Sequence, residues 1–503
     1  MALSAQRHLD AETTGPTMSP RDRIRHLYRR LGFGATPSEV DEAVKLGFEA
    51  TRKRLVEFEK TPMTDDVSPY EFVWREKEEP DLGTWRFGIW WALRMVTTPR
   101  PLQEKLALFW HDHFAVSENK VENGMMMLPY LRTLQEHAGG RFSNLLKAVS
   151  KEPAMMKFLD MNRQIRGVPN ENFAREVMEL FTLGIGNYTE EDVQAASRAF
   201  TGWGYNEIFW ELPGTTESKF RDSLKFDRPF AAFYYSPAMH DPSPKKILGK
   251  TAPFDGDSLL EMLAEHPQTA RYVCGKLWAY FAYDDPEPAV LNALVGTWKR
   301  THGNITAIVD EITRRPEFYS DKCVRSRVKS PVDLIVGVAR AMGLDKSLLR
   351  ERAKDATELT ALAKRPFDVA GEVMYHFTRT GMQILYPPDV AGWDWGTAWT
   401  SAALMAERMK FRGVALWREK GVGEGAQGVY DALAPLAPKT TEELAARFVE
   451  LFDVPLAENR LKPIVEALNR GGGVKALEKP ESTAGLIYHA LPVLMAAPET
   501  HLC

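Results

Sequence analysis

Signals for the start of a helix recur along almost the whole chain. A capping residue or an N-terminal proline precedes helix-period residues at Ser19-Pro20, Thr36 to Glu39, Thr98-Pro99, Glu152-Pro153, Pro169, Thr189 to Asp192 and Ser330-Pro331. Between these signals the apolar residues are three and four apart. Strand-like alternation is scarce; the best candidate is 226–235, which can pair with 246–250. We therefore predict a mostly α, multi-helix globular fold with one small β-hairpin and long functional loops.

Changes in composition suggest how the chain is divided. We expect a flexible N-terminus at 1–18, a main helical domain at 19–418, and a C-terminal helical subdomain at 419–503 packed on it, because a glycine-rich stretch precedes plain amphipathic helices there. Long loops are expected at 61–83, 202–253 and 386–398, and loops of this length in a helical protein usually carry function.

The charge balance limits the possible partners. A formal charge of -4 over 503 residues argues against a general nucleic-acid surface or an anionic-membrane surface, because both require a clustered basic excess. The exception is the basic helix expected at 21–30. It is either an amphipathic helix with solvated arginines or an anion site that uses Arg23, Arg29 and Arg30.

Three cysteines, none in a C-x-x-C pair, indicate neither a disulfide framework nor a zinc ribbon, and they fit a reducing compartment. No signal peptide or membrane-spanning stretch is recognisable. We expect a cytoplasmic protein with no membrane insertion, unless the protein is exported together with a partner.

The segment 170–184 carries polar groups without an evident packing role. At 3.6 residues per turn, Asn172, Glu176 and Glu179 form one stripe beside an apolar arc that covers most of the helix. The two carboxylates are expected to be half-buried, and a buried carboxylate needs a cation, a metal, a proton or backbone donors.

A structural alternative explains part of this stripe. Arg175 lies four residues from both Glu171 and Glu179, so it can serve both carboxylates in a surface network. Glu176 has no cation three or four positions away, so its partner must come from another segment.

Two histidines stand two residues apart at the end of an apolar helix that begins near Pro101. In a continuing helix His111 and His113 face different directions, whereas on an extended segment they share a face. They can ligate one metal only if the helix ends at about His111. The alternative is one core histidine and one surface histidine.

Two further groups are candidates. His240-Asp241 lies in a long loop and either ligates a metal or caps a turn. Trp203, Trp393 and Trp399 lie in glycine-containing loops, where flat rings bind sugars or other planar ligands. Sealing of the core explains them equally well.

No phosphate loop, H-E-x-x-H zinc helix, G-x-S-x-G elbow or strand-coupled G-x-G-x-x-G is present. The motifs that are present run in the order R-R-L-G-F-G-A-T-P (29–37), F-W-H-D-H-F-A (109–115), N-F-A-R-E (172–176), E-L-F-T-L-G (179–184) and a tryptophan-rich stretch (388–399). In this order they resemble the bacterial family known as domain of unknown function 1800, from about residue 20 to the C-terminus.

This resemblance implies a mostly helical fold but no established activity. It also implies a frequent genomic neighbour, the family of domain of unknown function 1501, which looks like the alkaline phosphatase and sulfatase group. The recognisable motifs of the domain of unknown function 1800 family contain His111, His113, Asn172, Arg175, Glu176, His240 and Asp241.

We therefore expect a buried polar pocket, roofed by the tryptophan loops, that suits a divalent metal such as zinc, iron or manganese. The expected roles are catalytic for Glu176 and Glu179, metal-binding for His111, His113, His240 and Asp241, and substrate-binding for Asn172, Arg175, Trp203, Trp393 and Trp399. Such a protein acts on a polar polymer or a glycan-like substrate. The alternative is a non-catalytic assembly or chaperone-like partner of a phosphatase-like or sulfatase-like protein, and the sequence leaves open whether the protein is an enzyme.

Overall fold

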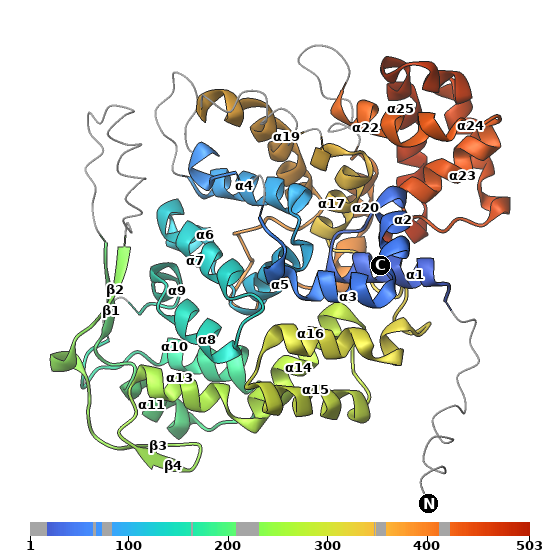
Figure 1. Cartoon of the computed structure of the whole chain (residues 1–503). Coiled ribbons are helices and arrows are strands. Elements are labelled where there is room, and N and C mark those ends of the chain that lie inside the picture. Colours follow the sequence, from blue (N-terminus) through green and yellow to red (C-terminus); the bar gives the residue numbers. More distant parts are fainter. Residues whose placement is uncertain are drawn as a thin grey trace, which may run out of the picture.

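The computed structural model describes residues 18–63, 67–72, 83–161, 164–207, 231–346, 348, 359–411 and 423–503. The predicted boundary near residue 418 and nearly all of the predicted N-terminal tail lie outside these ranges. Within them the chain is mostly α-helical, as predicted (Figure 1).

The α-helices up to residue 199 are α1 (Pro20–Leu31), α2 (Pro37–Leu46), α3 (Phe48–Val56), α4 (Thr84–Thr97), α5 (Pro101–His113), α6 (Glu118–Val121), α7 (Gly124–Glu136), α8 (Phe142–Ser150), α9 (Pro153–Phe158), α10 (Glu171–Glu176) and α11 (Glu190–Ala199). Those that follow are α13 (Gly256–Ala264), α14 (Pro267–Phe281), α15 (Pro288–Thr301), α16 (Ile305–Arg314), α17 (Pro331–Ala341), α19 (Leu359–Arg379), α20 (Ala402–Met409), α22 (Glu424–Leu433), α23 (Thr441–Leu451), α24 (Lys462–Arg470) and α25 (Pro480–Met495).

Short helical turns lie between these helices. One of them, η3 (Val177–Thr182), is a π-helical turn. The others are 3-10 turns: η1 (Phe58–Lys60), η2 (Pro69–Phe72), η4 (Pro237–Met239), η5 (Pro316–Tyr319), η6 (Gly396–Thr400), η7 (Ala434–Leu436), η8 (Glu458–Arg460), η9 (Gly473–Glu478) and η10 (Pro498–His501).

Local capping explains where many helices begin. Thr36, Thr189 and Ser330 each close a capping box with the acidic residue three positions later, which satisfies two otherwise free backbone donors. Ser19 caps α1 in the same way through the N–H of Asp22. These starts confirm the predictions made from sequence. The Thr98-Pro99 signal is displaced, because Thr98 closes α4 and α5 begins at Pro101.

The described strands form two antiparallel ribbons. β1 (Trp203–Glu207) pairs with β2 (Ala231–Tyr235), with Trp203 opposite Tyr235, and β3 (Lys245–Ile247) pairs with β4 (Lys250–Ala252). The predicted pairing of 226–235 with 246–250 is therefore wrong. The 245–252 segment closes on itself through a tight turn at Leu248-Gly249, where both residues have positive φ.

Helix α5 is the centre of the fold. Every residue from Leu102 to His113 is buried, and α5 packs against α7, α1, α3 and α4. Figure 1 shows α5 near the middle of the molecule, with the two ribbons at one edge and α23 to α25 at the other. The motif at the end of α5 thus lies in the main core.

Candidate functional site

The last turn of α5 carries His111, Asp112 and His113. The helix continues to His113 and closes where the Phe114 N–H donates to the Trp110 carbonyl at 2.8 Å. The condition under which both histidines share one metal, a helix end near His111, is not met. The two rings reach different parts of the core, as two-apart residues on a helix must.

Both ring nitrogens of His111 have protein partners. The Leu385 backbone N–H donates to Nε2 at 3.0 Å, so Nδ1 carries the proton and donates to the Tyr130 hydroxyl at 3.0 Å. Tyr130 in turn donates to the Phe114 carbonyl at 2.8 Å. Burial lowers the pKa of His111 to about 3, which keeps the ring neutral. No lone pair of this ring is left for a metal.

Asp112 holds the tryptophan-rich loop against α5. Its carboxylate accepts the Trp393 backbone N–H and the Trp395 indole N–H, each at 2.9 Å. Gly392, at φ +90°, lets the loop approach so closely that its Cα hydrogen faces the Asp112 carboxylate. Burial raises the pKa of Asp112 to about 6, against the opposing effect of these hydrogen bonds.

His113 points toward the segment that carries the glutamates. Its Nε2 donates to the Phe181 carbonyl at 3.1 Å, so Nδ1 is unprotonated, buried and without a hydrogen-bond partner. Burial, with a smaller contribution from the charge of Lys276, lowers the pKa of His113 well below its ordinary value. This ring is neutral and packs among aromatic side chains, including Phe109 and Phe114.

The segment 170–184 is not one continuous α-helix. α10 ends at Glu176 and the chain continues as the π-turn η3, in which the Leu183 N–H donates to the Met178 carbonyl five residues earlier. The wider turn leaves the Leu180 and Phe181 carbonyls free to accept from the Tyr272 hydroxyl and from His113. The assumed 3.6-residue period therefore fails after Glu176.

The glutamates of the polar stripe, Glu176 and Glu179, are partly exposed to water, and their like charges repel each other. Glu176 and Glu179 are half-buried, as expected. The Tyr188 hydroxyl donates to Glu179, whereas no ion pair or hydrogen bond reaches the Glu176 carboxylate from the described residues. Burial and the charge of Glu179 raise the pKa of Glu176, and Arg175 only partly opposes this.

Arg175 keeps one of its two predicted partners, Glu171, and gains Glu190 in place of Glu179. It binds Glu190 with two bonds of 2.7 Å and lies 3.7 Å from Glu171, so the prediction that it serves Glu179 is wrong. Tertiary folding brings α11 alongside α10, and this placement supplies Glu190. The Asn172 side chain donates weakly to the Leu159 carbonyl at 3.4 Å.

His240 and Asp241 close a separate loop. The His240 Nδ1–H donates to the Thr201 carbonyl at 2.9 Å, and Arg198 donates to the Asp241 carboxylate at 2.8 Å. Burial alone would raise the pKa of Asp241, but hydrogen bonds from Arg198 and Ser243 hold it well below its ordinary value. These contacts are those of a turn anchored to α11.

The tryptophans pack inside the protein. Trp203 lies between Phe200 and Phe233, with ring centroids 5.3 and 5.1 Å away. Trp393 meets the edge of His111 at 5.2 Å, and Trp399 packs on Trp395 at 5.0 Å. All three predicted substrate-binding tryptophans are buried.

The predicted site residues therefore do not surround one point. His111 and Asp112 meet the tryptophan loop, and His113 meets η3, but His240 and Asp241 lie against α11. Within the described ranges no three His, Cys, Asp or Glu side chains are grouped so that they can hold a metal ion. The residues present do not fit the expected metal centre.

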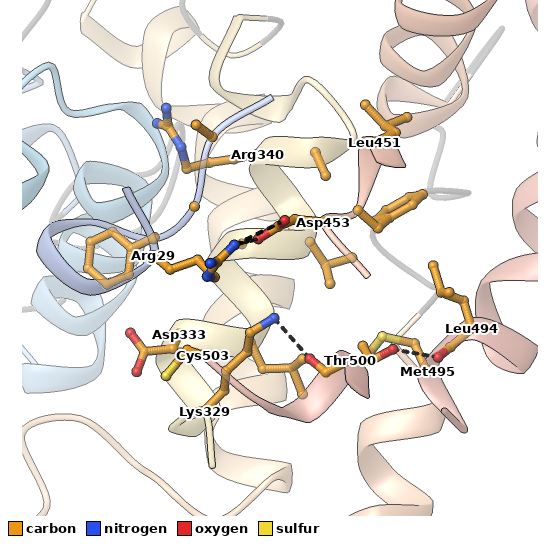
Figure 2. A pocket seen from close by; sticks show the side chains of 18 residues that line it. Arg29, Lys329, Asp333, Arg340, Leu451, Asp453, Leu494, Met495, Thr500 and Cys503 are labelled. Carbon is orange, nitrogen blue, oxygen red and sulfur yellow. Dashed lines mark hydrogen bonds and ion pairs between the residues drawn. The ribbon is translucent and has the colours of Figure 1, made fainter. Parts of the chain in front are cut away.

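A cavity with both apolar and charged lining residues lies elsewhere, between the N-terminal helices, α17 and the C-terminal helices (Figure 2). Its volume is about 40 Å³, and its polar lining includes Arg29, Lys329, Asp453 and Thr500. Asp333 and Arg340 also line it, and they form ion pairs with Lys105 and Glu39. Arg29 donates to Asp453 at 2.8 Å, and the Lys329 ammonium donates to the Thr500 carbonyl at 2.9 Å. We call these four residues the basic pocket.

Only one residue of the basic pocket lies in a segment that stands out in the sequence. Arg29 belongs to the basic helix, whereas Lys329 and Asp453 come from segments with no recognisable motif. Of the other two arginines proposed for an anion site, Arg30 is buried beside the pocket. Arg23 lies over Phe48, 4.0 Å from the ring centroid.

Comparison with known proteins identifies the family. The family model described as "Protein of unknown function (DUF1800)" matches residues 26–502. The chain belongs to this family. Neither the curated proteins nor the solved structures yielded a match. No helix in the described ranges combines the length and apolar character that a bilayer crossing requires.

Proposed function

We propose that this member of the DUF1800 family is a non-catalytic partner of another protein. One observation carries the proposal: the polar side chains at the end of α5 form hydrogen bonds that hold other segments of the chain in place. His111 holds Leu385, Asp112 holds Trp393, and His113 holds Phe181. Contacts of this kind fix helices and loops in register. Both ring nitrogens of His111 are used in this way, and the remaining free nitrogen of His113 is enclosed among aromatic side chains.

An apolar surface supports a partner role. Ile165, Val168, Tyr235 and Met239 are exposed, Val168 at 80%. They lie on neighbouring segments, because Ile165 bridges to Val168 and the Arg166 N–H donates to the Met239 carbonyl at 2.9 Å. Exposed apolar side chains gathered in one place mark contact surfaces in soluble proteins. We call these four residues the apolar patch.

The proposed partner is a protein of the domain of unknown function 1501 family, the neighbour that family membership implies. Co-expression followed by affinity purification tests it. The wild-type chain should retain the partner, and the double variant Val168→Asp with Met239→Asp should lose it. Leu436→Asp is the matched control, because Leu436 is 54% exposed in a different region of the chain. Equal retention by all three chains would place the contact elsewhere, and no retention by the wild type would contradict the partnership.

The competing proposal is a metal-dependent enzyme acting on a polar polymer or glycan, with Glu176 and Glu179 as catalytic groups. Elemental analysis of the wild type beside Glu176→Gln and His111→Ala distinguishes the two. We expect no stoichiometric zinc, iron or manganese in any of the three. Stoichiometric metal in the wild type that is lost in both variants would overturn our proposal. Glu176→Gln keeps this test informative if His111→Ala does not fold, because no hydrogen bond or ion pair reaches the Glu176 carboxylate from the residues that the structure describes.

A further inference from the structure

Six basic side chains lie in or beside the basic pocket: two of them line the cavity, and four further arginines contact residues that line it. This cation cluster consists of Arg29, Arg30, Arg325, Arg327, Lys329 and Arg408. Arg29, Arg30 and Arg408 are buried, and the other three are partly buried. Figure 2 shows Arg29 and Lys329 extending from different elements toward the same space. Cations withdrawn from water to this extent require compensating negative charge.

Asp453 supplies the ion pairs of the cluster. Its carboxylate binds Arg29 at 2.8 Å and Arg325 at 2.8 Å, which lowers its pKa to about 2 although burial alone would raise it. Across the described ranges, no other Asp or Glu side chain forms an ion pair with a member of the cluster. Asp333 also lines the cavity, but its ion pair is with Lys105. The six cations of the cluster therefore outnumber the carboxylates that lie near them.

The remaining cluster contacts are with uncharged groups. Arg30 donates to the Ala282 and Cys323 carbonyls and to the Cys503 sulfur. Arg408 donates to the Lys329 carbonyl at 3.0 Å. Burial raises the pKa of the Cys323 thiol, so this sulfur stays uncharged near neutral pH. Carbonyls and thiols satisfy donors but do not neutralise the charge.

Several donors of the cluster remain unused. Nε of Arg29, Arg30 and Arg408 and one terminal nitrogen each of Arg325 and Arg327 are buried without a partner. The Lys329 ammonium has three protons but makes one hydrogen bond, to Thr500. Unused donors on cationic groups are what an oxyanion satisfies most strongly.

Burial dominates the pKa values of three members of the cluster, whereas at Arg30 the effect of burial is outweighed by the neighbouring Cys503 and Cys323, which raise its pKa. Burial lowers the pKa of Lys329 to about 8 and the pKa of Arg325 and of Arg408 to about 10. An additional negative charge would raise all three.

We propose that the basic pocket binds a small tetrahedral oxyanion, either free phosphate or sulfate or the phosphate group of a monoester. Lys329 and Arg29 supply the direct contacts, and the rest of the cluster supplies the positive potential. The cavity of about 40 Å³ is room for about three water molecules, which a small anion can replace. The excess of cations over Asp453 and Asp333 makes the exchange favourable.

This site joins distant parts of the chain. Arg29 comes from α1, Lys329 precedes α17, Asp453 follows α23, and Thr500 lies in η10. A bound oxyanion therefore adds a tie between the N-terminal helices and the C-terminal helices, independent of any protein partner at the apolar patch.

Isothermal titration calorimetry of the full chain tests the proposal, with sodium phosphate, sodium sulfate and phenyl phosphate as probes. Sodium chloride keeps the ionic strength constant. We expect saturable binding of phosphate and sulfate, and a loss of about 10- to 100-fold in affinity for Lys329→Met and for Arg29→Gln, because each removes a charged hydrogen bond. Lys329→Arg should retain most of the affinity.

The matched control is Arg379→Gln, which removes one exposed cation that pairs with Glu407. It should bind like the wild type. Melting temperatures measured with and without sulfate give a second measure for any variant that folds poorly. If phenyl phosphate binds with the same affinity as free phosphate, the site accepts a phosphate monoester. If phenyl phosphate binds more weakly, the site is specific for the free ion. Both results support an oxyanion site. No saturable binding by the wild type, or equal affinity in Lys329→Met, would overturn it.

Discussion

Gly392 is the position where the close approach of the tryptophan loop to α5 can be tested most directly. The backbone there has φ +90°, and a Cβ added at this residue would overlap the Asp112 carboxylate and lie 2.7 Å from the Asp112 carbonyl oxygen. Gly396, four residues later in the same loop, has φ +69° with nothing within 4 Å of an added Cβ. The two glycines therefore share a conformational requirement but differ in crowding.

The expected loss of stability in each variant is the sum of the backbone strain at positive φ and the crowding around the added Cβ. A left-handed backbone costs a non-glycine residue about 1–2 kcal/mol. Overpacking against a rigid helix adds about 1–3 kcal/mol, because the carbonyl of α5 cannot move without disturbing the helix. Gly392→Ala should thus lower the free energy of unfolding by about 2–5 kcal/mol, and Gly396→Ala by about 1–2 kcal/mol.

Urea unfolding followed by tryptophan fluorescence measures both variants against the wild type. Hydrogen exchange of the peptide covering 386–399 reports the local effect, since displaced Asp112 releases the Trp393 N–H. Exchange in this peptide should increase in Gly392→Ala and change less in Gly396→Ala. If Gly392→Ala costs no more than Gly396→Ala, the loop is not held against Asp112 and the reasoning is refuted.

Three further predictions concern the same motif and the predicted site. Burial raises the pKa of Asp112 from 3.8 to about 6. Between these two pH values the folded state keeps a proton that the unfolded state releases. The stability contributed by protonated Asp112 is therefore fully present below pH about 4, and it falls by up to ~3 kcal/mol as the pH rises to about 6. The difference in urea unfolding free energy between wild type and Asp112→Asn should follow this fall, and a difference independent of pH would contradict it. His111→Ala should lower the free energy of unfolding by roughly 3–5 kcal/mol, because it leaves a cavity and a buried Leu385 N–H without an acceptor, whereas Arg175→Ala should leave the urea midpoint unchanged because its ion pair with Glu190 is exposed. A large loss in Arg175→Ala would show that the pair is structural.

Local sequence signals predicted the helical architecture well and the site poorly. Ser19, Thr36, Thr189 and Ser330 cap helices as predicted. A cap is a contact between residues three apart, so it is encoded where it forms. The prediction that 226–235 pairs with 246–250 was wrong because β2 pairs with β1. The two strands are far apart in the sequence, and no turn signal between them specifies this pairing.

The candidate site depended on partners that the sequence does not place. The stripe of Glu176 and Glu179 rested on a uniform 3.6-residue period, which η3 breaks in order to offer the Phe181 carbonyl to His113. The half-burial of both glutamates was foreseen. Among the described residues Glu176 has no hydrogen-bond or ion-pair partner. This outcome depends on how neighbouring elements pack and not on the helix that carries Glu176.

The sequence by itself thus determined the helical class, many helix starts and the family, because each is written in short-range patterns or ordered motifs. Only the tertiary structure decided what the polar residues do. It set Leu385 and Tyr130 against His111 and saturated a ring that the sequence had offered to a metal. It also gathered Arg29, Lys329 and Asp453 into one pocket. The charge of a buried group is balanced by whatever packing brings near it, and packing is a property of the whole chain.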